Sequence, residues 1–114
     1  MQTRCFCHVG DVVRALVDLT LLGEPAYGEV FNIGSQEEVS ILELASRVID
    51  LTGSDSEIHL IPYEAAYEAG FEDMPRRYPD VTKVGNALGW SSTRTLDEIL
   101  CDIIQFHQAE ASVV

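Results

Sequence analysis

Hydrophobic side chains recur at helical spacing in three stretches of the chain, which predicts three principal helices. The first helix follows Asp11, whose carboxylate suits an N-cap because it can accept hydrogen bonds from the free amides of the first turn. Gly23 and Pro25 end this helix. The side chains expected to face the core are Val12, Ala15, Leu16 and Leu19.

The second and third helices each begin with a capping box, a hydroxyl residue followed three positions later by glutamate. Ser40 and Glu43 form the first box, and Thr95 and Glu98 form the second. We expect the last helix to cover about 96–108. The side chains expected to be buried are Ile41, Leu44, Ala45, Val48 and Ile49 in the second helix, and Leu96, Ile99, Leu100, Ile103 and Phe106 in the third.

Short runs of β-forming residues predict strands at 3–9, 28–34 and 57–62. Each run is short, so we expect small strand pairings and not one large sheet. The first strand carries Arg4, which makes that cation better positioned than a loop residue.

Two short helical segments complete the pattern. One covers about 63–70, and the other is capped by Asp80 or Thr82 and ends at Gly89. We expect Trp90 to pack back against the second one, as an aromatic residue after a glycine stop often does. Together, these elements predict a small mixed α/β domain.

Composition fits a single domain over 1–114, with 46% hydrophobic and 23% charged residues. The net charge of −12 argues against nucleic acid as a partner, because nucleic-acid binding needs a basic face. No apolar run reaches the roughly 20 residues of a membrane helix. The first residues also lack the apolar centre of a signal peptide, so the expected location is cytoplasmic.

The three cysteines are expected to be free thiols, because their number is odd and no secretory signal accompanies them. Cys5 and Cys7 would lie on one face of a strand. A metal site that combines them with His8 is the alternative, with His59 or His107 as a further ligand. Their spacing matches none of the usual zinc signatures, so no metal ligand is expected.

A short segment at 74–90, here called the arginine window, contains two prolines beside an arginine pair. It holds three of the seven cations, namely Arg76, Arg77 and Lys83. The prolines restrict the backbone on both sides of the arginine pair. A guanidinium held on a stiffened loop suits phosphate, to which it can donate two parallel hydrogen bonds. The alternative is that the arginines only pair with nearby carboxylates such as Glu72 and Asp73.

Three elements of the sequence resemble the extended short-chain dehydrogenase/reductases. Segment 4–11 (RCFCHVGD) is similar to the family's R-x-F-x-(Y/H)-V-x-D element. Segments 30–34 and 39–44 resemble its "YNIG…VSILEL" stretch, and 77–83 with 88–90 resembles its "R-x-PD-x-x-K…LGW" ending. The likeness is strongest to UDP-glucuronate decarboxylases, dTDP-glucose 4,6-dehydratases and UDP-sugar 4-epimerases.

The resemblance covers only the C-terminal, substrate-binding part of such enzymes, and it implies a piece of a larger protein. The Rossmann domain is absent: no glycine cluster is present to bring a backbone close to a dinucleotide. The family's Tyr-x-x-x-Lys pair is also missing, because the sole lysine is Lys83 and Pro79 stands four residues before it. We therefore expect NAD in the full-length enzyme, but no cofactor site, no catalytic residue and no turnover in this chain.

The same resemblance assigns the candidate substrate-binding residues. Arg4 and Arg77, and less directly Arg76, match arginines that hold the diphosphate of a nucleotide sugar. Asp80 matches an acidic position that in some relatives binds the ribose, although its place before a short helix favours a cap. The expected partners are a nucleotide-diphosphate sugar and the missing Rossmann domain.

A different reading makes the chain a non-catalytic interaction or oligomerisation module. Surface that would pack on the Rossmann domain predicts an exposed apolar patch. That patch would favour self-association into a homo-oligomer.

Overall fold

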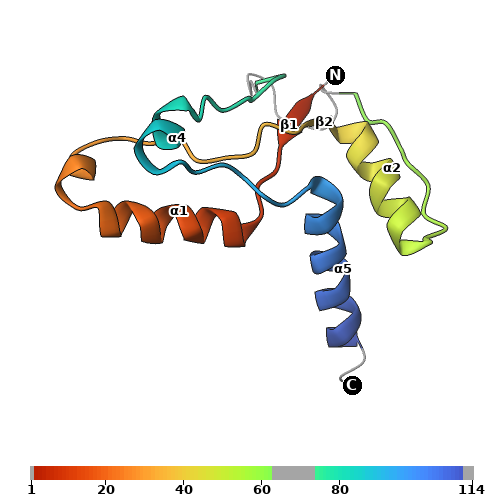
Figure 1. Ribbon diagram of the computed structural model, residues 1–114. Coiled ribbons are helices and arrows are strands. Elements are labelled where there is room, and N and C mark those ends of the chain that lie inside the picture. The colour runs from red at the N-terminus through yellow and green to blue at the C-terminus, as the bar shows by residue number, and fades with distance from the viewer. Residues whose placement is uncertain (1, 63–73, 112–114) are drawn as a thin grey trace.

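The computed structural model describes residues 2–62 and 74–111 (Figure 1). Its fold is a small mixed α/β arrangement, as predicted. The three principal helices are present, together with a short helix, a 3-10 turn and a two-stranded sheet. In chain order, the elements are β1 (Thr3–Cys5), α1 (Val9–Leu22), η1 (Glu24–Ala26), β2 (Glu38–Ser40), α2 (Ile41–Thr52), α4 (Thr82–Leu88) and α5 (Leu96–Ala111).

The sheet joins β1, near the start of the chain, to β2, which directly precedes α2. β1 pairs antiparallel with β2, so that Arg4 lies opposite Val39. The other edge of β1 meets the arginine window, where Thr3 forms a parallel bridge with Arg76 and its N–H donates to the Pro75 carbonyl at 2.9 Å. The arginine window is thereby fixed against β1.

Most helix ends follow the capping chemistry read from the sequence. The Ser40 hydroxyl accepts from the Glu43 N–H at 3.0 Å, and Thr95 exchanges hydrogen bonds with Glu98. Left-handed glycines end α2 and α4, at Gly53 with φ 67° and Gly89 with φ 66°. The helix expected at 63–70 lies outside the described residues.

The start of α1 differs from the prediction. β1 ends at Cys5, and α1 already begins at Val9. His8 is the N-cap, and its ring Nδ1 accepts from the Gly10 N–H at 2.9 Å. Asp11 therefore lies inside the first turn, and its carboxylate is directed to a distant loop.

The strands predicted at 28–34 and 57–62 are wrong for this structure. Both segments have no regular secondary structure, and neither pairs with a strand among the described residues. A β-forming sequence becomes a strand only when another backbone supplies its hydrogen bonds. Neither segment meets such a partner within the described chain.

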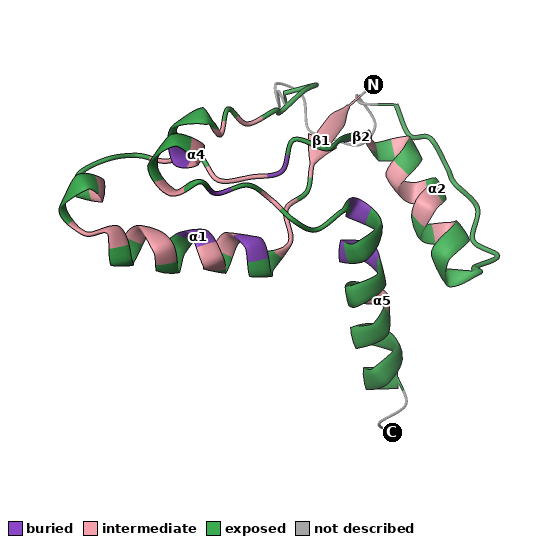
Figure 2. Cartoon of the chain, in the orientation of Figure 1, coloured by how far each residue is buried: buried purple, intermediate pink, exposed green. Residues whose placement is uncertain are grey.

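The core consists of two small clusters (Figure 2). Ala15, Val84 and Trp90 form the α1/α4 cluster, with partly buried side chains packed around them. The β2/α5 cluster consists of three buried side chains, Val39, Leu96 and Leu100. Each cluster is too small to bury all the apolar faces that surround it.

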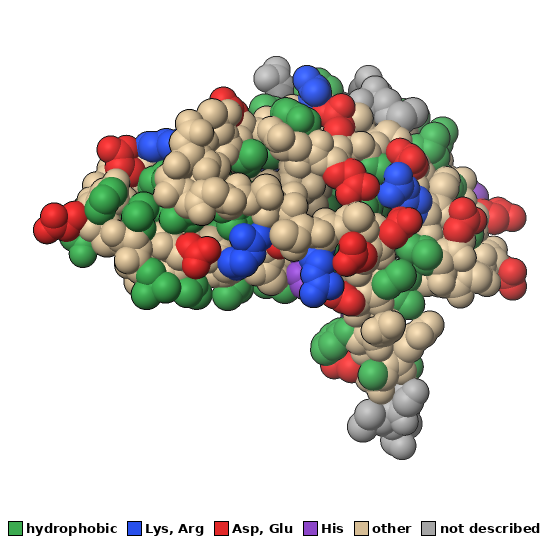
Figure 3. Space-filling model, in the orientation of Figure 1, with side chains coloured by type: hydrophobic (Ala, Val, Ile, Leu, Met, Phe, Trp, Pro, Cys, Tyr) green, Lys and Arg blue, Asp and Glu red, His purple; other side chains and the backbone are tan. Residues whose placement is uncertain are grey.

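Several side chains predicted to be buried are instead exposed. Leu16 is 56% exposed on α1 and Phe106 is 59% exposed on α5. Ile41, Val48 and Ile103 are also exposed, because nothing in the described chain covers these helix faces. Hydrophobic side chains gather along the free edge of α1 in Figure 3. The predicted exposed apolar patch is thus confirmed, whereas self-association stays a prediction.

The chain is also unusually extended. Its radius of gyration is 17.7 Å, whereas a compact domain of this length has about 13 Å. Its accessible surface is 8286 Å², against about 6,200 Å² for a compact protein of the same mass. Figure 1 shows α5 projecting away from the rest of the chain. Much of the surface that a compact domain of this length would bury is therefore exposed.

Candidate functional site

The arginine window and β1 meet at the bridge between Thr3 and Arg76. Arg4 and Arg77 each follow one partner of this bridge, so the two sequence motifs that carry them come together although they lie far apart in the chain. Arg4 is half-buried, and its Nη1 donates to the Thr3 carbonyl at 2.7 Å. Arg77 is exposed. The bridge is the structural centre of the predicted site.

Arg76 has a structural partner. Its Nε donates to Glu38 Oε2 at 2.6 Å, and its guanidinium lies over the Tyr78 ring at 5.0 Å. The hydrogen bond and charge of Glu38 raise the pKa of Arg76. The alternative prediction, that the arginines pair with carboxylates, therefore holds for Arg76. Its partner is Glu38 on β2, and not a carboxylate that is close in the sequence.

Asp80 lies just before Val81, the N-cap residue of α4. Its carboxylate accepts from the Thr82 N–H at 3.0 Å, at the start of α4. Hydrogen bonds from Thr82 lower the pKa of Asp80, so the carboxylate is held charged there. The Asp80 carboxylate therefore contacts the start of α4 from outside the N-cap position, and its role toward a ribose stays a prediction.

Segment 29–38 holds the window in place from the other side. Lys83 pairs with Glu29 at 2.7 Å and lies over the Phe31 ring at 4.9 Å. Gln36 donates to the Pro79 carbonyl at 3.2 Å. The two segments run antiparallel, because the start of segment 29–38 contacts Lys83 and its later part contacts Pro79. These contacts fix the window along its length.

Gly34 makes this approach close. A Cβ at Gly34 would lie 3.0 Å from Pro79 Cγ, a separation that real Cβ atoms rarely show. A side chain at Gly34 would therefore require Pro79 to move by a few tenths of an ångström.

Asp11 is the buried hub that sequence reasoning assigned wrongly. Its two oxygens accept from the Thr93 N–H and hydroxyl at 3.0 and 2.8 Å, and from the Arg94 N–H at 3.1 Å. Arg14 donates to the same carboxylate at 3.1 Å. The Asp11 carbonyl accepts from the Trp90 indole at 3.0 Å. This network ties α1 to the segment between α4 and α5.

The network makes the stability of the chain pH-dependent. Burial alone would raise the pKa of Asp11, but the hydrogen bonds from Thr93, Arg94 and Arg14 lower it from 3.8 to about 2. Because the folded pKa lies below the unfolded one, this stabilisation is complete above pH 4 and is lost as the pH falls toward 2. The pKa difference corresponds to about 2 kcal/mol of unfolding free energy.

Urea unfolding at pH 5 and at pH 2 measures this loss. Other carboxylates also titrate in that range, so the Asp11→Asn variant is the reference. The drop in unfolding free energy should be about 2 kcal/mol larger for the natural chain than for Asp11→Asn. Equal drops would show that the Asp11 pKa is not lowered.

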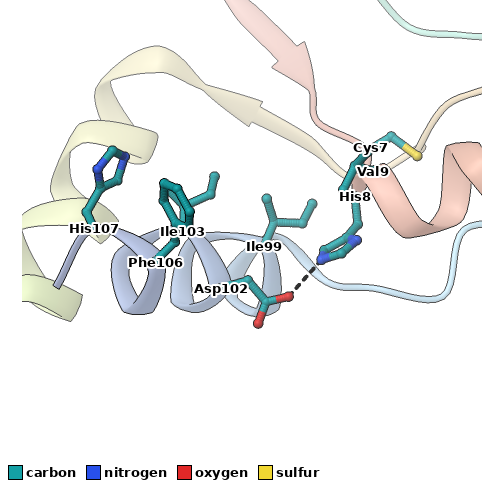
Figure 4. A pocket seen from close by; sticks show the side chains of 8 residues that line it. All are labelled: Cys7, His8, Val9, Ile99, Asp102, Ile103, Phe106 and His107. Carbon is teal, nitrogen blue, oxygen red and sulfur yellow. Dashed lines mark hydrogen bonds and ion pairs between the residues drawn. The ribbon is translucent and has the colours of Figure 1, made fainter. Parts of the chain in front are cut away.

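A second feature unforeseen from the sequence is an open groove where α1 begins beside α5 (Figure 4). Its volume is about 570 Å³. The His8 ring points toward α5, and its Nε2 lies 2.7 Å from Asp102 Oδ2. Because Nδ1 accepts from Gly10, Nε2 carries the proton that is donated to Asp102. The lining residues are Cys7, His8, Val9, Ile99, Asp102, Ile103, Phe106 and His107.

The cysteines are free thiols where the structure describes them. Burial raises the pKa of both Cys5 and Cys7, so these thiols stay protonated near neutral pH. Within residues 2–62 and 74–111, no three His, Cys, Asp or Glu side chains are arranged to hold a metal ion. In the same residues, no helix is both long and apolar enough to cross a bilayer.

No family model matches the chain. Among curated proteins, the UDP-N-acetyl-alpha-D-glucosaminuronate decarboxylase of Bacillus cytotoxicus is 40% identical over 105 residues, which are 92% of this chain and 32% of that protein. UDP-glucuronic acid decarboxylase 1 of Danio rerio is 37% identical over 111 residues, 96% of this chain and 24% of its own. The chain spans about a third or less of these relatives.

Solved structures match in the same way. The Bordetella bronchiseptica enzyme WbmF, in complex with NAD+ and UDP, superposes with a TM-score of 0.74 at 29% identity. The match covers 97% of this chain and 31% of WbmF. At 22% identity, an epimerase from Methanothermobacter thermautotrophicus shares the fold with a TM-score of 0.83, over 98% of this chain and 32% of its own.

Proposed function

We propose that this chain, which is homologous in sequence and fold to one part of the extended short-chain dehydrogenase/reductases, is the nucleotide-sugar-binding part of such an enzyme. The complete enzyme would be an NAD-dependent decarboxylase, dehydratase or epimerase. The chain's contribution would be to hold the diphosphate of the substrate. On its own it would not turn substrate over.

The bridge between Thr3 and Arg76 is the observation that carries this proposal. The bridge is isolated, but where a parallel register continues past a bridged pair, the next two residues are neighbours on the same face. The next residues are Arg4 and Arg77, so the register favours a pair of guanidinium groups on one side. Two adjacent guanidinium groups suit a diphosphate, because each can donate two parallel hydrogen bonds to phosphate oxygens.

The charge distribution limits where an anionic ligand could bind. The chain has a net charge of −12, so an anion is repelled by most of its surface. Figure 3 shows Lys and Arg side chains lying beside carboxylates over much of one face. Arg76 is already paired with Glu38. Of the arginine pair in the window, we assign the ligand to Arg77, which follows the bridge beside Arg4, and a positioning role to Arg76, which pairs with Glu38.

NAD chemistry would come from other polypeptide. In the complete enzyme, bound NAD would supply redox chemistry for the sugar. The glycines and the tyrosine–lysine pair that the family uses for this step are not present in the sequence. This chain's own residues would bind and orient the substrate, and no step through the cofactor is assigned to them.

Titration of the chain with UDP and with dTDP, followed through backbone amide shifts, tests the proposal. We expect shifts confined to β1 and to residues 76–80, at millimolar affinity because half of the pocket is missing. Uridine is the control, since it lacks the diphosphate and should cause no shifts there. Shifts that avoid both segments would contradict the proposal.

The exposed apolar faces of α1 and α5 favour a second candidate, an interaction module without a ligand. The Arg4→Ala and Arg77→Ala variants separate the two functions. Under the interaction hypothesis, binding to a partner survives both substitutions. Under the substrate-binding hypothesis, the response to UDP is lost.

A further inference from the structure

The small sheet at the candidate site has two faces that carry different side chains. In an antiparallel pair, directly opposite residues share a face, and neighbours along a strand alternate between the faces. Cys5 lies opposite Glu38, so these two side chains share one face. Arg4 lies opposite Val39, and this pair shares the other face. The Glu38 carboxylate and the Arg4 side chain are therefore on opposite sides of the sheet.

Arg76 joins Glu38 on its face. The Arg76 Nε donates to Glu38 Oε2 at 2.6 Å, and Thr3, which bridges Arg76, has the same alternation as Cys5. Burial raises the pKa of the Cys5 thiol most, and the charges of Glu38 and Arg76 act on the same thiol in opposite directions. Geometry and electrostatics thus gather these side chains on one side of the sheet.

The alternation continues into the arginine window. The Arg76 guanidinium lies over the Tyr78 ring at 5.0 Å, so the side chains of these two residues share a side. Arg77 stands between them in the sequence. Because neighbouring side chains of an extended segment alternate, this pattern favours Arg77 on the opposite side, the face that carries Arg4.

The contact between the window and β1 is short. Within the described residues it is an isolated bridge, which joins Thr3 to Arg76. One bridge fixes few backbone groups, so side-chain contacts decide how firmly the segment around Arg77 is held. The bond from Arg76 to Glu38 is the charge-assisted contact that ties this segment to β2.

We infer that Glu38 is a positioning residue of the diphosphate site, which anchors Arg76 on the back of the sheet so that Arg77 and Arg4 face the ligand together. The inference rests on the proposed function and names the residue that orders its arginines. Glu38 acts through Arg76 and does not touch the ligand. The pair is partly exposed, with 64% of the Arg76 side chain and 30% of the Glu38 side chain accessible, so its effect belongs to binding more than to stability.

The sign of the effect separates positioning from general charge. Removal of Glu38 takes one negative charge away from the neighbourhood of an anion site, so electrostatics alone predicts tighter binding of UDP. Loss of positioning predicts weaker binding, because the ligand must then order the window itself. The cost of ordering one long side chain corresponds to roughly a 3–10-fold rise in Kd.

The test is titration of the natural chain and of Glu38→Ala with UDP, followed through the amides of β1 and residues 76–80. We expect a Kd roughly 3–10-fold higher for Glu38→Ala. Glu38→Gln loses the same charge but keeps an acceptor for the Arg76 Nε, so its Kd should lie between the two. The matched control is Glu43→Ala, which removes a carboxylate paired with Arg47 at 3.1 Å within α2 and should not weaken binding.

A double-mutant cycle shows whether Glu38 acts through Arg76. If it does, Arg76→Ala and the double variant with Glu38→Ala should bind UDP equally, within about twofold. A double variant that binds clearly more weakly than Arg76→Ala would mean that Glu38 acts by another route, and the inference would be wrong.

Two other results overturn the inference. They are a Glu38→Ala chain that binds UDP as tightly as the natural chain or more tightly, and a Glu43→Ala chain that loses as much affinity as Glu38→Ala. If alanine at position 38 prevents folding, Glu38→Gln decides by the same sign. When the natural chain responds to UDP at β1 and residues 76–80 but the Glu38 variants respond equally, the proposed function stands without this inference. When the natural chain does not respond there, both fail.

Discussion

Replacement of Asp11 by alanine is expected to lower the free energy of unfolding by about 3–5 kcal/mol. The carboxylate is only 3% exposed, and it accepts four hydrogen bonds from Thr93, Arg94 and Arg14. Alanine would leave these donors, including a guanidinium, without their acceptor in a partly buried site. A chain of this length has roughly 6–17 kcal/mol of stability, so the loss would be a large part of the total.

Urea unfolding of the two proteins at neutral pH measures this difference. Asp18→Ala is the matched control, because it removes a half-buried aspartate from the same helix. We expect Asp18→Ala to change stability by less than about 1 kcal/mol. If Asp11→Ala were as mild as this control, the hub would not hold α1 to the segment between α4 and α5.

The helix ends were predictable from the sequence because capping is local. Ser40 reaches an amide three residues away, and Thr95 does the same with Glu98. Gly53 and Gly89 adopt the positive φ that only glycine adopts at little cost. Within the described residues, these signals require no information about the rest of the chain.

The role of Asp11 was not predictable in this way. An aspartate before a hydrophobic repeat is a normal N-cap, and the competing acceptor role depends on Thr93, which is 82 positions away. His8 is the N-cap instead, and its ring is held by a second contact that is also distant in sequence, with Asp102 on α5. Only the tertiary structure shows that His8, and not Asp11, caps α1.

Burial was over-predicted for a physical reason. Helical periodicity identifies an apolar face but not what covers it. Leu16 and Phe106 lie on such faces and remain exposed, as does Val30 in a segment with strand-like alternation. Nothing in the described residues covers these side chains, and the chain spans 32% of the Bacillus cytotoxicus relative.

The candidate site was predicted through family resemblance, and its geometry adds a distinction. Sequence alone treats the two window arginines almost alike, whereas Glu38 pairs with Arg76 at 2.6 Å. Since β2 carries Glu38 and pairs with β1, the same small sheet that holds Arg4 also holds Arg76. The sheet therefore works as a platform that orients the window.

Substitution of Arg77 or Arg4 by alanine is expected to abolish the amide shifts caused by UDP. Truncating one partner of a charge-assisted contact costs about 2 kcal/mol or more, roughly a 30-fold rise in Kd, which exceeds what a weak site can tolerate. Arg77→Lys should recover only part of the response, because an ammonium lacks the planar fork that binds two oxygens. Arg76→Ala should weaken binding less, since its Nε is engaged by Glu38.

Arg94→Ala provides the matched control for net charge. Arg94 is an exposed cation that pairs with Glu98 at 3.6 Å on α5, and its loss changes the overall charge by the same amount. If binding depended only on the general field of the chain, Arg94→Ala and Arg77→Ala would weaken it equally. If specific guanidinium groups hold the diphosphate, UDP should shift the amides of Arg94→Ala as it does in the natural chain. It should not shift the amides of Arg77→Ala. Equal responses from the two variants would refute the assignment of Arg77.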